Sequence, residues 1–206
     1  MEAEGERENT VFVIDDDVDI RRSLRRLLEE VNLRVKEFRS AQDFLNAHSP
    51  DACGCVILDI RMPEMSGIEL QKAMQSLDIH LPVIFVTGHA DVAMAVECMK
   101  RGAFDFIEKP FRAQRLLDTI QRALHQERAD RAERIRIADD TQRARLLTAR
   151  EREVVGLSVG GLNNREIAEK LGVSSQAIDS HRSKAMRKLE VENVPDLVRL
   201  VERVQG

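Results

Sequence analysis

Polar side chains stand at the ends of several short apolar runs in this sequence. Asp15 and Asp16 follow one run, Asp59 a second, Thr87 a third and Lys109 a fourth. An apolar run that stops at a turn is typical of a strand buried on both faces. Because the carboxyl ends of parallel strands meet at one edge of a sheet, we expect these side chains to converge there.

Converging carboxylates repel one another unless a cation joins them, and all-oxygen ligation suits Mg²⁺ (or Mn²⁺). A hydroxyl from Thr87 and an ammonium from Lys109 beside such a metal would form a site for a tetrahedral dianion. The predicted chemistry is phosphoryl transfer with Asp59 as the nucleophile. Taken alone, Asp59 is better interpreted as a residue that merely starts a loop; the other strand-end residues argue against that interpretation.

The elements that must position these side chains alternate between the strand and helix periods. Five apolar runs, each followed by a helical pattern, predict an α/β fold with a five-stranded, doubly wound parallel sheet. The runs lie at residues 11–14, 34–38, 55–59, 81–86 and 104–107. We assign residues 10–124 to this domain.

Five ordered motifs of this segment resemble the receiver domain of bacterial response regulators, which has a flavodoxin-like fold. They are Asp15-Asp16, Leu58-Asp59, the pairs Met62-Pro63 and Ser66-Gly67, Val86-Thr87-Gly88, and Lys109-Pro110-Phe111. The resemblance implies that Asp59 accepts a phosphoryl group from a phosphohistidine on a sensor histidine kinase.

The same resemblance implies roles for the other residues of the site. Asp16, Asp59 and the backbone carbonyl of Arg61 would hold the metal, with Asp15 supporting it. Lys109 would pair with the acyl phosphate, and the peptide bond before Pro110 would be cis. Thr87 and Phe106 would form the switch pair that reports phosphorylation to the surface.

Two residues stand at positions that vary in this family and flank the path of an attacking water. These are Arg61 and His89. We hypothesise that they set the lifetime of the phosphoaspartate by tuning its dephosphorylation. Two solvated side chains at the rim of the site explain the sequence equally well.

Residues 125–146 are interpreted as a solvated helical linker. Its apolar stripe fades, while Glu127/Arg131 and Asp130/Arg134 form i,i+4 pairs that support an exposed helix. The helix is expected to run to about Arg136 and to break at residues 139–141. No sustained heptad pattern supports a coiled coil.

Residues 147–206 predict an all-α, four-helix domain that contains a helix-turn-helix. Thr148 and Glu151 form a capping box, and Gly172 lies in the turn between the second and third helices. The runs Leu147–Glu151, Asn164–Ala168, His181-Arg182 and Lys188-Leu189 resemble the DNA-binding domain of the LuxR/FixJ group. The whole chain therefore resembles a response regulator of the NarL/FixJ family.

The resemblance implies which residues contact DNA. Base edges in the major groove would face Asp179, Ser180 and Ser183, and phosphates would be contacted by Arg182, Lys184 and Lys188. Small and acidic side chains at the base-facing positions leave more of the recognition to DNA shape and phosphates. His181 is expected to pack beneath the helix, and the last helix to dimerise the domain.

Composition and charge fit two domains with different partners. Residues 1–124 carry 16 Lys and Arg against 22 Asp and Glu, a net charge of −6, while residues 147–206 carry 10 against 9, a net of +1. The acidic N-terminus and the absence of an apolar stretch of about 18 residues predict a soluble, cytoplasmic protein without membrane contact. Cys53 and Cys55 lie too close together for a zinc site and are expected to be buried.

These observations together predict a two-component, DNA-binding response regulator that is not an enzyme. Phosphorylation of Asp59 would promote formation of a homodimer and its binding to promoters. The expected outcome is activation of transcription, with RNA polymerase as a further partner. A phosphohydrolase is the alternative, but that class needs a second acid two residues after the nucleophile, where this chain has Arg61. A regulator that works without phosphorylation is the third alternative, and the intact acidic pocket argues against it.

Overall fold

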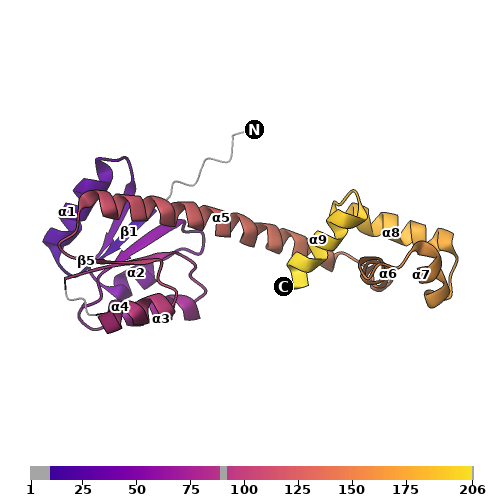
Figure 1. Cartoon of the computed structure of the whole chain (residues 1–206), viewed down its shortest axis with the longest axis horizontal. Coiled ribbons are helices and arrows are strands. Elements are labelled where there is room, and N and C mark those ends of the chain that lie inside the picture. Colours follow the sequence, from indigo (N-terminus) through magenta and orange to yellow (C-terminus); the bar gives the residue numbers. More distant parts are fainter. Residues whose placement is uncertain (1–9, 89–91, 206) are drawn as a thin grey trace. The chain divides into compact units, whose positions relative to one another are not determined.

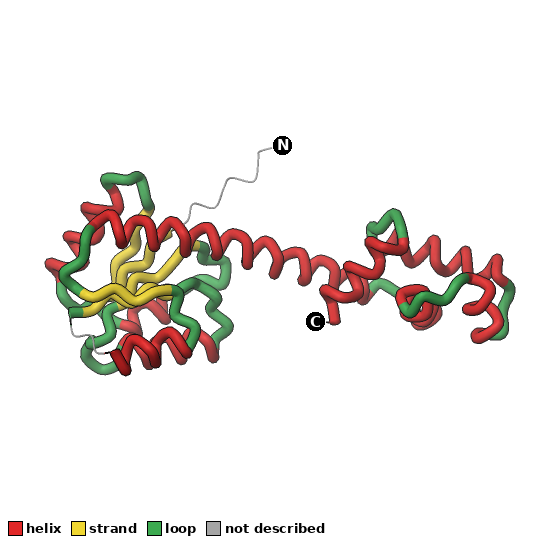
Figure 2. The backbone as a smooth tube through the Cα atoms, in the orientation of Figure 1, coloured by secondary structure: helices red, strands yellow, loops and turns green. Residues whose placement is uncertain are grey.

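The computed structural model describes residues 10–88 and 92–205. The chain divides into two compact units, Met1–Asp130 and Arg131–Gly206. Figures 1 and 2 show the helices and strands of both units.

The first unit is built on a parallel sheet that has five strands within the described residues. The strands are β1 (Thr10–Ile14), β2 (Arg34–Phe38), β3 (Gly54–Leu58), β4 (Val83–Thr87) and β5 (Asp105–Glu108). Their order is β2-β1-β3-β4-β5, and every pair is parallel. The strands are drawn in yellow in Figure 2. The predicted doubly wound sheet is therefore confirmed. The direction of winding reverses between β1 and β3, and ligands of such folds bind at this switch point.

Helices cover both faces of the sheet (Figure 1). They are α1 (Val18–Glu29), α2 (Ala41–Ala47), α3 (Gly67–Ser76), α4 (Val92–Lys100) and the first part of α5 (Ala113–Arg145). On one face, Val13 and Ile57 pack with residues of α1 and α5; on the other, Ile14 and Leu58 pack with residues of α2 and α3. Successive strand residues thus enter opposite cores, which explains the unbroken apolar runs in the sequence.

The second unit contains the rest of α5 and four further helices within the described residues. These are α6 (Ala149–Val159), α7 (Asn164–Leu171), α8 (Ser175–Leu189) and α9 (Val194–Gln205). Side chains at the N-caps define three helix starts: Thr148 for α6, Asn163 for α7 and Ser174 for α8. Gly172 ends α7 in the left-handed conformation, with φ of 65°, and turns the chain into α8. The predicted helix-turn-helix is therefore confirmed as α7–turn–α8.

The linker helix extends further than the sequence predicted. The expectation that it ends near Arg136 and breaks at residues 139–141 is wrong, because α5 continues to Arg145. Asp140 is buried, and its carboxylate accepts two hydrogen bonds from Arg203 on α9, at 2.9 Å from Nε and 2.7 Å from Nη2. Ala144 packs in the same apolar cluster as Leu197 of α9. These contacts outweigh the small intrinsic cost of Asp in a helix interior.

No helix in the described part of the chain is long and apolar enough to cross a membrane.

Substitution of Asp140 tests the role of this buried pair. Asp140→Asn leaves the Arg203 guanidinium without its counter-charge and should lower the free energy of unfolding of the second unit by about 2 kcal/mol. The adjacent Asp139 is exposed, so Asp139→Asn is the matched control and should change little. Chemical denaturation followed by circular dichroism measures both. Equal stabilities of the two variants would contradict this account of why α5 continues.

Candidate functional site

The carboxyl ends of three strands bring together an acidic pair and a lysine. The Lys109 ammonium, after β5, lies 2.8 Å from Asp15 Oδ2, after β1, and 3.4 Å from Asp59 Oδ1, after β3. Asp15 is 4% exposed and Asp59 8% exposed. The predicted convergence of these side chains at the sheet edge is therefore present in the fold.

Backbone amides fix the remaining carboxylate oxygens. The amide of Asp17 donates to Asp15 Oδ1 at 2.9 Å, and the amide of Arg61 donates to Asp59 Oδ2 at 2.7 Å. Each of these hydrogen bonds favours the ionised form of the carboxyl group that accepts it. Each carboxylate is thus oriented by one cation and one amide.

The environment of Asp59 disfavours its charged form. Burial raises the pKa of this carboxyl, the ammonium of Lys109 opposes the rise, and the neighbouring Asp15 adds to it. An ionised Asp59 is therefore an electrostatically costly group in this fold, as expected of a carboxylate positioned for reaction.

The loop that carries Asp15 and Asp16 is held by Arg21 of α1, a residue for which no role was predicted. Arg21 Nη1 on α1 donates to the backbone carbonyls of Asp15, at 2.7 Å, and Asp16, at 3.0 Å. This contact could have been predicted from the sequence. A long side chain in the first turn of a helix points back towards the helix N-terminus, and Asp17 is the N-cap of α1.

The predicted switch pair lies on the adjacent strands. Thr87 is buried at the end of β4, and its carbonyl accepts a hydrogen bond from the Lys109 amide at 2.8 Å. Phe106 on β5 is half-buried, with its ring centroid 6.5 Å from that of Phe85. The peptide bond between Lys109 and Pro110 is cis, as the resemblance implied.

A glycine allows the loop after Asp59 to fold back against the strand end. The amide of Gly67 donates to the Ile60 carbonyl at 2.9 Å, and a Cβ on Gly67 would stand 2.3 Å from the Asp59 carbonyl oxygen. No side chain fits there. This close approach accounts for the Ser66-Gly67 motif, in which Ser66 also caps α3.

The residues present fit a divalent cation of the Mg²⁺ type. Asp15 and Asp59 carry two negative charges against the single positive charge of Lys109, and Asp16, the next residue in the chain after Asp15, is exposed. Within the described ranges no three His, Cys, Asp or Glu side chains lie together so that they could hold a metal ion. Mg²⁺ does not require three such side chains, since it is held by one or two carboxylates and keeps several waters.

Arg61 and His89 are the two residues predicted to tune dephosphorylation. Arg61 is exposed at the rim, directly after the loop begins. His89 lies outside the described residues.

The second candidate surface is α8 with the preceding turn. Ser180, Ser183 and Lys184 are exposed on it, and Arg182 and His181 are half-buried. The predicted base-facing and phosphate-facing residues therefore lie on one helix, although their contacts to DNA stay predictions.

Three of the residues predicted to contact DNA, Asp179, Arg182 and Lys188, already have partners inside the domain. Asp179 accepts hydrogen bonds from Asn164 of α7 and, at 3.5 Å, from Arg182. Lys188 donates to Glu151 Oε2 at 2.6 Å and to the Leu146 carbonyl at 3.1 Å. The contacts of Asp179 with Asn164 and of Lys188 with Glu151 were not predicted, because each joins residues that are far apart in the chain.

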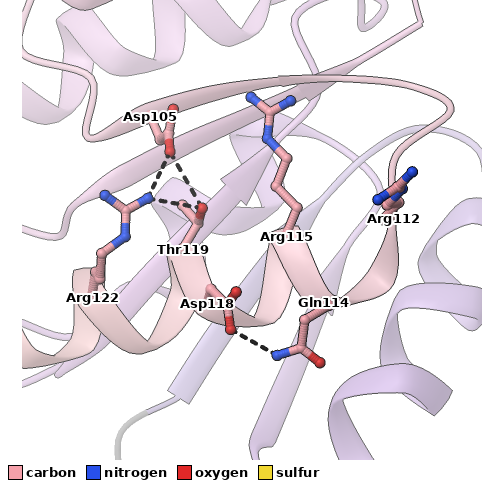
Figure 3. A pocket seen from close by; sticks show the side chains of 7 residues that line it. All are labelled: Asp105, Arg112, Gln114, Arg115, Asp118, Thr119 and Arg122. Atoms are coloured by element: carbon pink, nitrogen blue, oxygen red, sulfur yellow. Dashed lines mark hydrogen bonds and ion pairs between the residues drawn. The ribbon is translucent and has the colours of Figure 1, made fainter.

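A third feature is an open concavity of about 610 Å³ between β5 and α5 (Figure 3). Its lining residues are Asp105, Arg112, Gln114, Arg115, Asp118, Thr119 and Arg122. Asp105 pairs with Arg122 at 3.1 Å, so β5 and α5 present charges of both signs here.

Comparisons with known proteins match both units. Residues 11–121 match the response regulator receiver domain, and residues 145–201 match the bacterial regulatory proteins of the luxR family. The transcriptional regulatory protein FixJ of Rhizobium meliloti is 41% identical, over 93% of this chain and 94% of FixJ. The response regulator protein TodT of Pseudomonas putida is 38% identical, over 98% and 88%. The solved structure of the response regulator StyR is similar with a TM-score of 0.86 and 41% identity, over 95% and 99%.

Substitution of Asp59 by Asn should stabilise the first unit in the absence of divalent cations. The raised pKa of Asp59 means that its ionised form costs stability at pH 7, and Asn removes that charge. The difference in melting temperature should be largest at pH 7. It should shrink as the pH falls through the raised pKa, and vanish below about 4, where the carboxyl is protonated in the folded and unfolded states alike.

Differential scanning calorimetry in EDTA at both ends of this range measures the effect. Glu30→Gln, which alters an exposed carboxylate of the same unit, is the control and should change little at either pH. A wild-type protein as stable as Asp59→Asn at pH 7 would contradict the assigned cost of burying this charge.

Proposed function

Because this chain belongs to the two-component response regulators that join a receiver domain to a LuxR-type DNA-binding domain, we propose that phosphorylation of Asp59 controls how it dimerises and binds promoters. The matched families cover both units, and the relatives are transcriptional regulators. The chain is accordingly a DNA-binding regulator with a phosphodonor kinase as partner, and not an enzyme. The phosphohydrolase alternative is set aside on the same grounds.

One observation carries the proposal. Lys109 draws the carboxylates of Asp15 and Asp59 together at the switch point of a sheet, in a chain that also contains a helix-turn-helix. We assign the first unit to signal reception and the second to DNA binding.

In the proposed reaction a carboxylate oxygen of Asp59 attacks the phosphorus of a phosphohistidine on the kinase. The P–O bond to Asp59 forms as the P–N bond breaks, and the histidine leaves with its electron pair. Lys109 stays beside the acyl phosphate and offsets part of its charge. We assign Asp15, Asp16, Asp59 and the Arg61 carbonyl to Mg²⁺ (or Mn²⁺), which would neutralise charge on the transferring phosphoryl group.

We propose that Thr87 and Phe106 couple this charge to the surface. Support comes from their positions, since Thr87 is buried at the strand end beside Lys109, and Phe106 lies half-buried on the neighbouring strand. A phosphoryl oxygen that accepts a hydrogen bond from Thr87 would change the space that the Phe106 ring can occupy. The affected surface would be α4, β5 and α5.

That surface offers both apolar and charged groups for a second copy of the chain. Val92, Val96 and Met99 form an exposed apolar stripe on α4 at 82%, 46% and 45% exposure. Asp105 and Arg122 contribute opposite charges nearby (Figure 3). We infer that receiver dimerisation here raises the effective concentration of the second DNA-binding domain at its half-site.

For DNA we propose that Ser180, Ser183 and Asp179 face base edges and that Arg182 and Lys184 contact phosphates. A dimer would then require an operator with two related half-sites. We further propose that the protein acts in the cytoplasm and that contact with RNA polymerase makes it an activator.

Phosphorylation from acetyl phosphate with Mg²⁺ tests the reaction. The wild type should acquire one phosphoryl group and bind a duplex selected from a random pool about tenfold more tightly, through dimerisation. Asp59→Asn should acquire none and keep its basal affinity, while Glu30→Gln should behave as the wild type. Mass spectrometry and fluorescence anisotropy measure the two effects. A label that persists on Asp59→Asn, or an affinity that acetyl phosphate leaves unchanged, would argue against the proposal.

Arg61→Ala tests the lifetime of the phosphoaspartate. The amide of Arg61 holds Asp59 Oδ2 and is kept in the variant, so only the exposed side chain at the rim is lost. Loss of the guanidinium should open the approach of water and speed dephosphorylation by about twofold or more. The decay of the phosphorylated species after removal of acetyl phosphate gives the rate, and His89→Ala is measured beside it. Unchanged rates in both variants would remove the hypothesis.

A further inference from the structure

We propose that Lys188 positions the recognition helix α8 within the DNA-binding domain and does not contact DNA phosphates. The inference rests on the DNA-binding function proposed above and concerns how the domain presents α8. It replaces the phosphate contact that the resemblance to the LuxR/FixJ group implied for this lysine.

The ammonium of Lys188 is committed to partners inside the domain. It lies 2.6 Å from Glu151 Oε2 and 3.1 Å from the Leu146 carbonyl oxygen. Two of its three donors are therefore used. A phosphate contact would require the ammonium to leave a carboxylate.

That carboxylate is poorly placed to lose its cation. Glu151 is only 3% exposed, and its Oε2 also accepts the Thr148 amide at 2.9 Å. The hydrogen bond from Lys188, followed by the one from the Thr148 amide, lowers the pKa of Glu151 to about 2. Without Lys188 a buried negative charge would remain, which is costly in a protein interior.

The contact joins three segments of the unit. Leu146 directly follows the end of α5, Glu151 lies in the first turn of α6, and Lys188 is next to the last residue of α8. Beside this polar contact, Leu147 and Leu189 pack in one apolar cluster. The C-terminal end of the recognition helix is thus fixed by a polar and an apolar contact to the same turn.

A second lysine on the same helix provides the contrast. Lys184 lies one turn earlier, is exposed, and has no hydrogen bond or ion pair to any residue in the described part of the chain. Helical spacing places the two lysines on one side of α8, and the resemblance to the LuxR/FixJ group implied the same role for both. The two lysines differ because Lys188 contacts Glu151, which is distant in the sequence, and Lys184 does not.

The experiment compares Lys188→Met, Glu151→Gln and Lys184→Met in the full-length, acetyl phosphate-treated protein. The probes are a duplex selected by the wild type from a random pool and an unrelated duplex of equal length. Affinities are measured by anisotropy across a range of KCl concentrations, at temperatures below the melting midpoint of every variant.

If Lys188 positions α8, its Met variant should lose about tenfold in affinity for the selected duplex, since a loosened supporting contact misplaces a binding surface. The unrelated duplex should be bound nearly as before, and the salt slope should stay that of the wild type. Glu151→Gln should reproduce this pattern, although Glu151 is buried and cannot touch DNA. Lys184→Met should instead weaken binding to both duplexes and reduce the salt slope by about 0.9. Lys188→Arg, which keeps the charge, should restore most of the selected-duplex affinity.

Two results would overturn the inference. A salt slope that falls in Lys188→Met as in Lys184→Met, with wild-type binding by Glu151→Gln, would identify a phosphate contact. Lower melting temperatures with unchanged affinities would show that the contact serves stability alone. A wild type that selects no duplex would refute the DNA-binding function itself, an outcome distinct from the other two.

Discussion

The first unit depends on a lysine ammonium held between two buried carboxylates. Asp15 and Asp59 follow neighbouring strands, β1 and β3, and their charges would repel each other if Lys109 did not reach across from the end of β5. The parallel sheet makes this possible, since it brings the ends of distant segments to one edge. Its two apolar cores hold the strands in register, and the positions of the three charges follow from that register.

The second unit relies on a comparable arrangement of buried charges. Asp140 with Arg203 joins α5 to α9, and Glu151 with Lys188 joins α6 to α8. In both pairs the acid is nearly buried while the base keeps partial exposure, at 30% for Arg203 and 34% for Lys188. Such pairs specify which helix faces meet, a role that apolar contacts alone fill less well.

Much of the fold and the acidic pocket could be predicted because local signals determine them. Apolar runs with polar ends predicted the strands and their alternation with helices along the chain. Capping residues such as Thr148 predicted where helices begin. The end of α5 could not be predicted, since Asp140 resembles a helix breaker until Arg203 is known to pair with it. The partners of Lys188 could not be predicted either. Helical periodicity indicates on which side of a helix a residue lies, but not which distant residue it contacts there.

The boundary between the two units lies inside α5, after Asp130, and this has a consequence for modularity. A gene fragment or an evolutionary exchange that began the DNA-binding module at residue 147 would keep every residue of the helix-turn-helix. It would nevertheless separate Arg203 from Asp140 and remove Ala144 from the cluster that covers α9. The segment that can be transferred as a whole therefore begins near Arg131, within a continuous helix and not in a loop.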